Sequence, residues 1–104
     1  MANKLAIIYS VTHRVQGELI LDGFDKGARF PKLSMKKKRE LYTELSSVLR
    51  ILVYVDTGNL SDEIKLQKGA EQEKKVKAIC KKLGLNYGNF HKEAEKEWEG
   101  KVWR

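Results

Sequence analysis

Apolar and polar residues alternate with periods that divide the chain into four segments, separated by turn-forming residues at 23–31, 57–59 and 84–86. The clearest stripe, with spacings of four, three, one and three positions, consists of Leu41, Leu45, Val48, Leu49 and Leu52. This spacing predicts an amphipathic helix, and Ser34 is suited to cap its start. Residues 51–55 are rich in β-formers, so the helix could instead stop near Arg50 and give way to a strand.

The third segment, residues 61–83, also has helical spacing. One side of it carries Ile64, Val76, Ile79, Cys80 and Leu83. Asp62 and Glu63 suit the first turn of this helix, because negatively charged carboxylates there interact favourably with the positive end of the helix dipole.

The first segment, residues 4–22, fits two patterns. Its helical set is Leu5, Ile8, Thr12, Val15 and Leu19. Its alternating set, with many β-branched side chains, is Leu5, Ile7, Tyr9, Val11 and Val15. We favour a helix, whereas Gly17 and the later run that ends at Asp22 and Gly23 leave a β-hairpin as the alternative.

The length of 104 residues predicts a single domain over 1–104. The helical spacing of its segments predicts a mainly α fold with about four helices, the last two of which form a C-terminal helix-turn-helix unit through the turn at 84–86. The alternative fold class is α+β with an N-terminal hairpin. The single cysteine excludes an internal disulfide, and no signal peptide or spanning segment is visible at the N-terminus. We therefore expect a cytoplasmic protein with no membrane association.

The charge is basic and unevenly distributed, with a net value of +7. Residues 1–40 hold nine basic and four acidic side chains, 41–69 hold three and four, and 70–104 hold nine and six. The densest cluster, which follows Lys26, Arg29 and Lys32, is Lys36, Lys37, Lys38 and Arg39. Such a charge favours nucleic acid as the partner, although a solvated helix face would have the same composition.

Residues 76–92 meet the demands of a tight turn between two helices. These are a small residue at Cys80, an apolar one at Leu83, a glycine able to take positive φ at Gly84, and an apolar plug at Phe90. Asn86 is a good cap for the second helix. The alternative is an architectural corner of a helical bundle that never contacts nucleic acid.

Residues 79–92 resemble the helix-turn-helix of bacterial and phage DNA-binding proteins. Cys80 stands where that family usually has Ala, Phe90 replaces Val or Ile, and Glu93 departs from a position that is usually apolar. The resemblance implies that the second helix enters the major groove, where Asn86, Asn89 and His91 read or position bases and the lysines contact phosphate. An asparagine amide is able to read adenine. Together with the basic clusters, the candidate nucleic-acid-binding residues are Lys36, Lys37, Lys38, Arg39, Lys74, Lys75, Lys81, Lys82, Asn86, Tyr87, Asn89, His91 and Lys92.

The sequence indicates a non-enzymatic protein without cofactor or metal. One cysteine and two histidines cannot supply a usual zinc site, and Cys80 falls on the apolar face of its helix. We expect His13 to be partly buried, and Asp56 has no partner carboxylate for catalysis. No phosphate-binding glycine loop is present. The function we predict is therefore that of a small DNA-binding regulator or mobile-element accessory protein, with DNA favoured over RNA and a homodimer suited to a palindromic site.

A second hypothesis is a basic helical-bundle interaction protein that binds an acidic protein or a ribonucleoprotein. Trp98 and Trp103 would then be its anchors, unless they lock the C-terminal segment onto the core. The segment 29–32, Arg-Phe-Pro-Lys, is similar to the inter-helix turn of small basic four-helix-bundle accessory proteins that work with reverse transcriptases.

Overall fold

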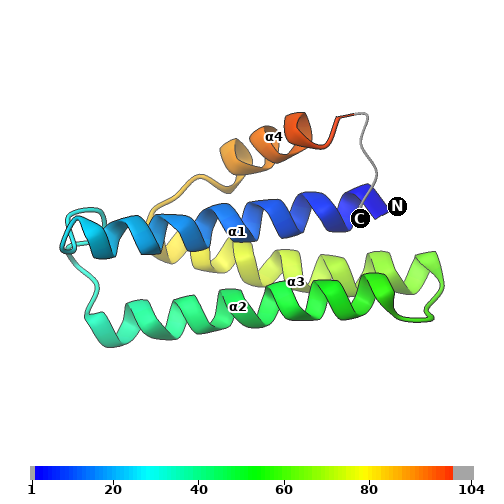
Figure 1. The fold of residues 1–104 in the computed structure, drawn as a ribbon, viewed down its shortest axis with the longest axis horizontal. Coiled ribbons are helices and arrows are strands. Elements are labelled where there is room, and N and C mark those ends of the chain that lie inside the picture. Colours follow the sequence, from blue (N-terminus) through cyan, green and yellow to red (C-terminus); the bar gives the residue numbers. More distant parts are fainter. Residues whose placement is uncertain (1, 100–104) are drawn as a thin grey trace.

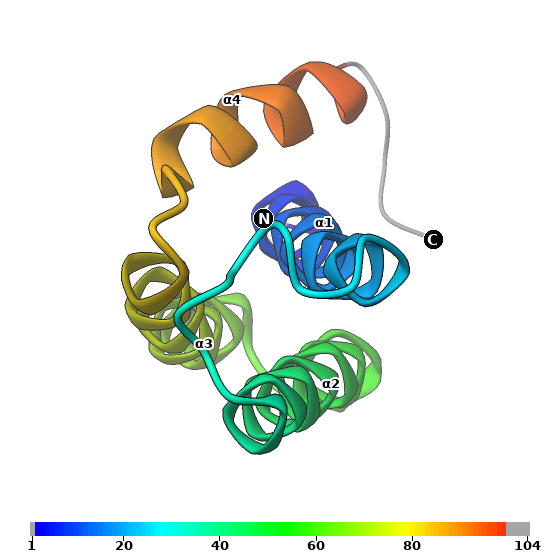
Figure 2. The same ribbon diagram turned by 90° about the vertical axis from the view of Figure 1, so that its left-hand side faces the viewer.

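A computed structural model describes residues 2–99 of the chain. These residues form four helices and no strand: α1 (Ala2–Phe24), α2 (Met35–Thr57), α3 (Asp62–Leu83) and α4 (Tyr87–Glu97). Helices α1, α2 and α3 lie side by side, and α4 crosses α1 on the side away from α2 (Figures 1 and 2). The prediction of a mainly α fold is confirmed, and the α+β alternative is wrong because residues 4–22 lie within α1.

Helix α1 is the central element, since its contacts with the other three helices are more extensive than those of any other helix. Ala6, Ile7 and Tyr9 lie beside its main buried face and also pack against the core. The buried residues of the helix are Leu5, Ala6, Ile8, Val11, Thr12, Val15, Gln16, Leu19 and Asp22. A helix that is covered on several sides loses the single apolar stripe that identifies an amphipathic helix. This explains why the sequence of this segment also fits an alternating strand.

Helix α2 has the stripe that the sequence predicts, and its length settles the ambiguity of residues 51–55. Ser34 caps the helix by accepting the Lys37 backbone N–H at 3.1 Å. The helix continues to Thr57, so the hypothesis of a strand after Arg50 is wrong. Val55 extends the buried stripe beyond Leu52, so residues 51–55 pack against the core as part of the helix.

Two capping residues flank helix α3. Ser61 precedes it and accepts the Ile64 backbone N–H at 3.3 Å, and Gly84 follows it in the left-handed conformation with φ of 73°. The predicted core face is confirmed from Val76 onward, but Ile64 is 40% exposed and lies outside the core. The buried Gly69 allows α3 to approach α1 closely, because a Cβ at this position would lie 2.7 Å from the Leu5 Cδ2 atom.

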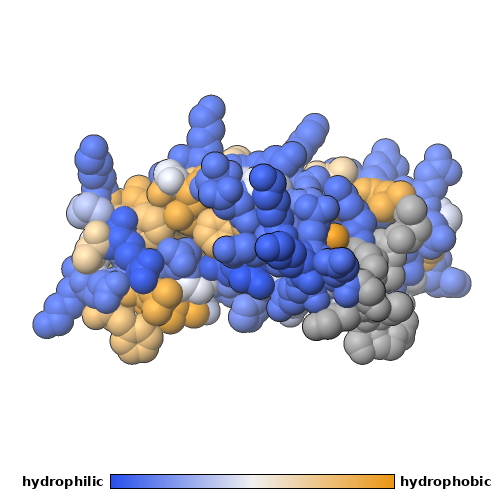
Figure 3. Space-filling model, turned by 90° about the horizontal axis from the view of Figure 1, so that it is seen from above, coloured by the Kyte–Doolittle hydropathy of each residue, from blue (hydrophilic) through white to orange (hydrophobic). Residues whose placement is uncertain are grey.

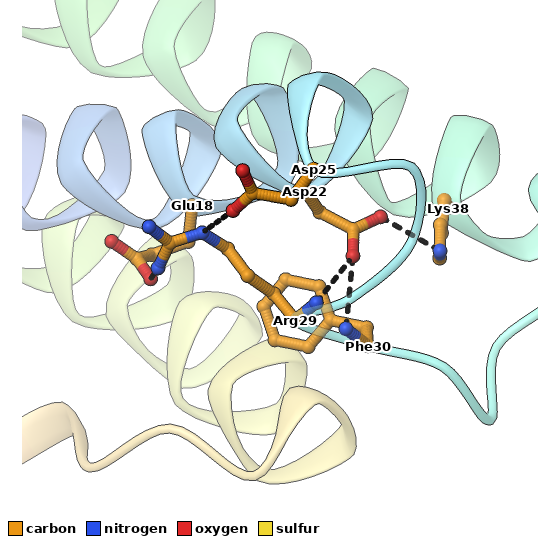
Figure 4. A network of polar contacts seen from close by, with 6 residues as sticks. All are labelled: Glu18, Asp22, Asp25, Arg29, Phe30 and Lys38. Carbon is orange, nitrogen blue, oxygen red and sulfur yellow. Dashed lines mark hydrogen bonds and ion pairs between the residues drawn. The ribbon is translucent and has the colours of Figure 1, made fainter.

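The loop between α1 and α2 is organised by one buried carboxylate (Figure 4). Asp22 accepts the backbone N–H groups of Arg29 at 3.1 Å and Phe30 at 2.9 Å, and its other oxygen lies 2.7 Å from the Lys38 Nζ atom. The hydrogen bond from Lys38 lowers the pKa of Asp22 below its usual value, although burial acts in the opposite direction. The loop and the start of α2 are thus fixed relative to the end of α1.

Helix α4 is held mainly by α1. Ala94 is fully buried, and Tyr87 and Phe90 are half-buried against the core. On α1, Arg14 contacts the carboxylates of Glu93 and Glu97, each at 3.4 Å. The short fourth helix is therefore docked along the bundle.

Candidate nucleic-acid interface

One end of the bundle gathers cations from parts of the chain that are distant in sequence. The end of α1, the start of α2 and the end of α3 meet there (Figures 1 and 2). The exposed cations of this region, which we call the basic end, are Lys26, Arg29, Lys32, Lys36, Arg39, Lys81 and Lys82.

A cleft of about 330 Å³ lies between the α1–α2 loop and the α3–α4 turn. Its walls carry Arg29 and Lys32 from the loop, and Lys81 and Lys82 from the last turn of α3. The guanidinium of Arg29 is already paired with Glu18 at 3.0 Å and Asp25 at 3.2 Å, so Lys32, Lys81 and Lys82 are the cations of the cleft without such partners among the described residues. Phe30, Leu33, Leu83 and other residues of the two segments complete the lining. All four of these cations are exposed, so a ligand can reach them from the solvent. The cleft can therefore accept a phosphate group between two cationic walls.

The lysine run at the start of α2 divides into two kinds of side chain. Lys38 is nearly buried in its ion pair with Asp22, and Lys37 lies 3.8 Å from the Glu40 carboxylate. Lys36 and Arg39 are exposed and form no ion pair within the part of the chain that the structure describes. Of the four sequence candidates, Lys36 and Arg39 are thus the ones whose charge remains available to a ligand.

The four candidate lysines of α3, Lys74, Lys75, Lys81 and Lys82, are all exposed. Lys74 and Lys81 are seven positions apart, as are Lys75 and Lys82, so each pair lies on one face about 10.5 Å apart along the helix axis. The cationic surface of the basic end therefore continues along the outer face of α3.

The first turns of α4 hold five sequence candidates, three of which already have partners within the chain. Asn86 caps the helix by accepting the Asn89 backbone N–H at 3.2 Å. The Tyr87 hydroxyl donates to Glu73 at 2.8 Å. Burial raises the pKa of Tyr87, and this hydrogen bond raises it further. The His91 Nδ1 atom lies 3.2 Å from Glu95.

Among the five candidates at the start of α4, the side chains of Asn89 and Lys92 are exposed and form no hydrogen bond or ion pair with the described residues. These two are therefore the α4 side chains best placed to meet a ligand.

The turn before α4 has one feature of a helix-turn-helix and lacks another. Gly84 adopts positive φ, as the sequence predicts. However, α4 contacts α1 more extensively than α3. The departure at Glu93 has a structural counterpart, because its carboxylate pairs with Arg14 of α1 where a helix-turn-helix packs an apolar residue.

The remaining candidates for chemistry lie apart from the basic end. Cys80 is buried, and this burial raises the pKa of its thiol to about 11. His13 is exposed and stacks against Tyr9, so the expectation of a partly buried imidazole is wrong. Trp98 is half-buried beside α1, and Trp103 lies outside the described residues.

Neither a metal centre nor a transmembrane helix is found in residues 2–99. No cluster of three or more His, Cys, Asp or Glu side chains in this range could hold a metal ion. None of the helices in this range is long and apolar enough to cross a bilayer.

The sequence identified the α2 cluster and the α3 lysines separately, but no periodicity indicates that they share one end. The sequence also places Arg29 and Lys32 just before the α2 cluster, but nothing in it shows that the α1–α2 loop lies against the end of α3. Comparisons with models of known protein families, with curated proteins and with solved structures found no match for this chain.

Proposed function

We propose that this chain is a non-enzymatic nucleic-acid-binding protein that holds phosphates against its basic end. The observation that carries the proposal is the cleft whose lining brings Lys32 of the α1–α2 loop together with Lys81 and Lys82 of α3. A phosphate backbone is the biological polyanion that best matches repeated cations on a rigid surface, and its binding releases counterions.

The proposed contacts differ in what they contribute. Lysines and arginines of the basic end and of α3 contact phosphate, which positions the ligand without selecting a sequence. Asn89, at the exposed start of α4, is the candidate for reading a base edge, since an asparagine amide can pair with adenine. DNA is the preferred ligand in this proposal, and a regulator or mobile-element accessory protein is the corresponding role. Two such units in a homodimer would suit a palindromic site.

The test is a fluorescence-anisotropy titration of a labelled 20-base-pair duplex across the range from about 50 to 200 mM salt. The double variant Lys81→Ala/Lys82→Ala removes one wall of the cleft. Its control, Arg50→Ala/Lys96→Ala, removes the same charge from exposed positions that lie outside both the basic end and α3. Each lost phosphate contact should reduce the magnitude of the slope of log K against log salt by about 0.9. The ratio of the affinity at about 50 mM salt to that at about 200 mM salt should then fall by about 3.5-fold.

The proposal requires the cleft variant to bind more weakly than the control, with a slope smaller by about 1.8. Equal losses in both variants would mean that binding follows net charge alone, which overturns the assignment of the basic end. Absence of binding at the lowest salt overturns the function itself. Asn89→Ala should reduce the preference for one duplex sequence over another while leaving the salt slope unchanged.

A further inference from the structure

A second surface lies on the bundle beside the basic end and is lined by apolar side chains. A groove of about 530 Å³ separates the last turns of α1 from the first turns of α2. Ile20 of α1 and Met35 and Tyr42 of α2 line it, and each of these side chains is between 39% and 59% exposed. Apolar surface at this end of the molecule is visible in Figure 3 among hydrophilic side chains.

The groove is open because of particular residues in its walls. Gly23 lies one turn after Leu19 on α1, and a Cβ at this position would meet no atom within 4 Å. On α2, Met35, Arg39 and Tyr42 recur at spacings of four and three and so share one face. Next to Gly23, Phe24 is 79% exposed, which adds apolar surface to the same end of α1. Exposed apolar side chains gathered at one end of a folded protein favour an interaction site there.

The rim of the groove is positively charged. Lys26 and Arg39 are exposed along it. The carboxylate in the lining, Asp22, is 1% exposed and already accepts Lys38 and two backbone N–H groups. The groove therefore presents an apolar floor and a cationic edge to a ligand.

We infer that this groove docks an acidic amphipathic helix of a partner protein. Two neighbouring helices provide a channel for a third, whose apolar anchors at i, i+3 or i+4, and i+7 would contact Ile20, Met35 and Tyr42. Glu or Asp residues beside those anchors would meet Lys26 and Arg39. Nucleic acid fits this groove less well, because aliphatic side chains predominate over the aromatic platforms on which bases stack.

The probe is a labelled 18-residue peptide with leucine at the anchor positions and glutamate beside them. Two comparison peptides define what is recognised: one has lysine in place of every glutamate, and one has the acidic composition in scrambled order. Anisotropy at moderate salt should show the acidic amphipathic peptide binding at least tenfold more tightly than either comparison peptide.

Variants of the protein locate the site. Ile20→Ser/Met35→Ser removes two apolar contacts without changing charge, and we expect at least a tenfold loss of affinity. Arg39→Gln removes a rim charge and should cost at least threefold. The matched control is Tyr54→Ser, an exposed apolar residue of α2 at the opposite end, which should leave binding unchanged. Since all these side chains are exposed, thermal unfolding should confirm that each variant folds.

The outcomes separate this inference from the proposed function. Lys81→Ala/Lys82→Ala should retain peptide binding even where it loses the duplex, because those lysines do not line the groove. Equal binding of the acidic and scrambled peptides, or unchanged binding by Ile20→Ser/Met35→Ser, overturns the inference. It is also overturned if the serine variant instead abolishes self-association in sedimentation, since the groove would then be covered by a second copy of the chain, or if the variant loses only duplex binding.

Discussion

The contact between Gly69 of α3 and Leu5 of α1 makes a sharp prediction about what sets the spacing of the bundle. An alanine at position 69 would place its Cβ 2.7 Å from the Leu5 Cδ2 atom, well inside van der Waals contact. Leu5 is 1% exposed, so its methyl group has little room to move. Overpacking of this kind costs about 1–3 kcal/mol, whereas replacing a helical glycine by alanine gains about 1 kcal/mol. Gly69→Ala should therefore destabilise the protein by about 0–2 kcal/mol.

The assay is a double-mutant cycle in which urea denaturation measures the free energy of unfolding of each variant. In a Leu5→Ala background the methyl group is gone, and Gly69→Ala should then stabilise the protein by about 1 kcal/mol. Gly17→Ala in α1 is the control, because a Cβ there meets nothing within 4 Å. It should stabilise by about 1 kcal/mol in both backgrounds, which corresponds to a rise of about 4–8 °C in Tm for a domain near this size. The reasoning is refuted if Gly69→Ala stabilises the wild-type protein as much as Gly17→Ala does, or if Leu5→Ala leaves its effect unchanged.

Two further predictions concern the loops that shape the basic end. Gly84→Ala should destabilise the protein by about 1–2 kcal/mol in thermal unfolding, because φ is 73° and the left-handed region penalises a Cβ even where space is free; an unchanged Tm would contradict this. The lowered pKa of Asp22 means that its carboxylate contributes stability above the unfolded-state value of 3.8, and that this contribution is lost as pH falls through the folded-state pKa. Urea midpoints measured from pH 6 downward should therefore fall less steeply below this value for Asp22→Asn than for the wild-type protein, and parallel curves would show that Asp22 contributes nothing to acid sensitivity.

The sequence predicts the helices best where each has one covered face. Leu41 to Leu52 identify α2 because only one stripe of that helix is buried, and Ser34 and Gly84 mark helix ends through local chemistry that needs no tertiary contact. The segment of α1 was ambiguous for the opposite reason, since burial on several sides removes the periodic contrast between apolar and polar positions.

The candidate site was predictable only in its composition. Lysine clusters can be counted in a sequence, but whether an ammonium group is free depends on partners many positions away. The ammonium group of Lys38 is paired with Asp22, and the hydroxyl of Tyr87 donates to Glu73. In each case the packing of the bundle creates the contact. The cleft itself depends on the α1–α2 loop folding back toward the end of α3, which no local pattern encodes.

The lysines at the start of α2 oppose the field of their own helix, and this conflict connects stability to the proposed function. The first turn of α2 contains no acidic residue, so its positive dipole end faces cations. Each unfavourable charge there costs about 0.3–1 kcal/mol at low salt. Lys38 is compensated by Asp22, whereas Lys36 forms no ion pair with the described residues. Lys36→Gln should therefore raise the free energy of unfolding by about 0.3–1 kcal/mol at low salt.

The same substitution should act in the opposite direction on the complex, because phosphate would interact with the charge that the dipole disfavours. Loss of one phosphate contact should make duplex affinity about 3.5-fold less sensitive to a change from about 50 to 200 mM salt. Arg50→Gln, in the second half of α2, is the control and should change neither the unfolding free energy nor the salt slope appreciably. If Lys36→Gln stabilises the protein and leaves duplex binding intact, the charge at this position has no role at the interface, and the cleft alone would have to account for binding.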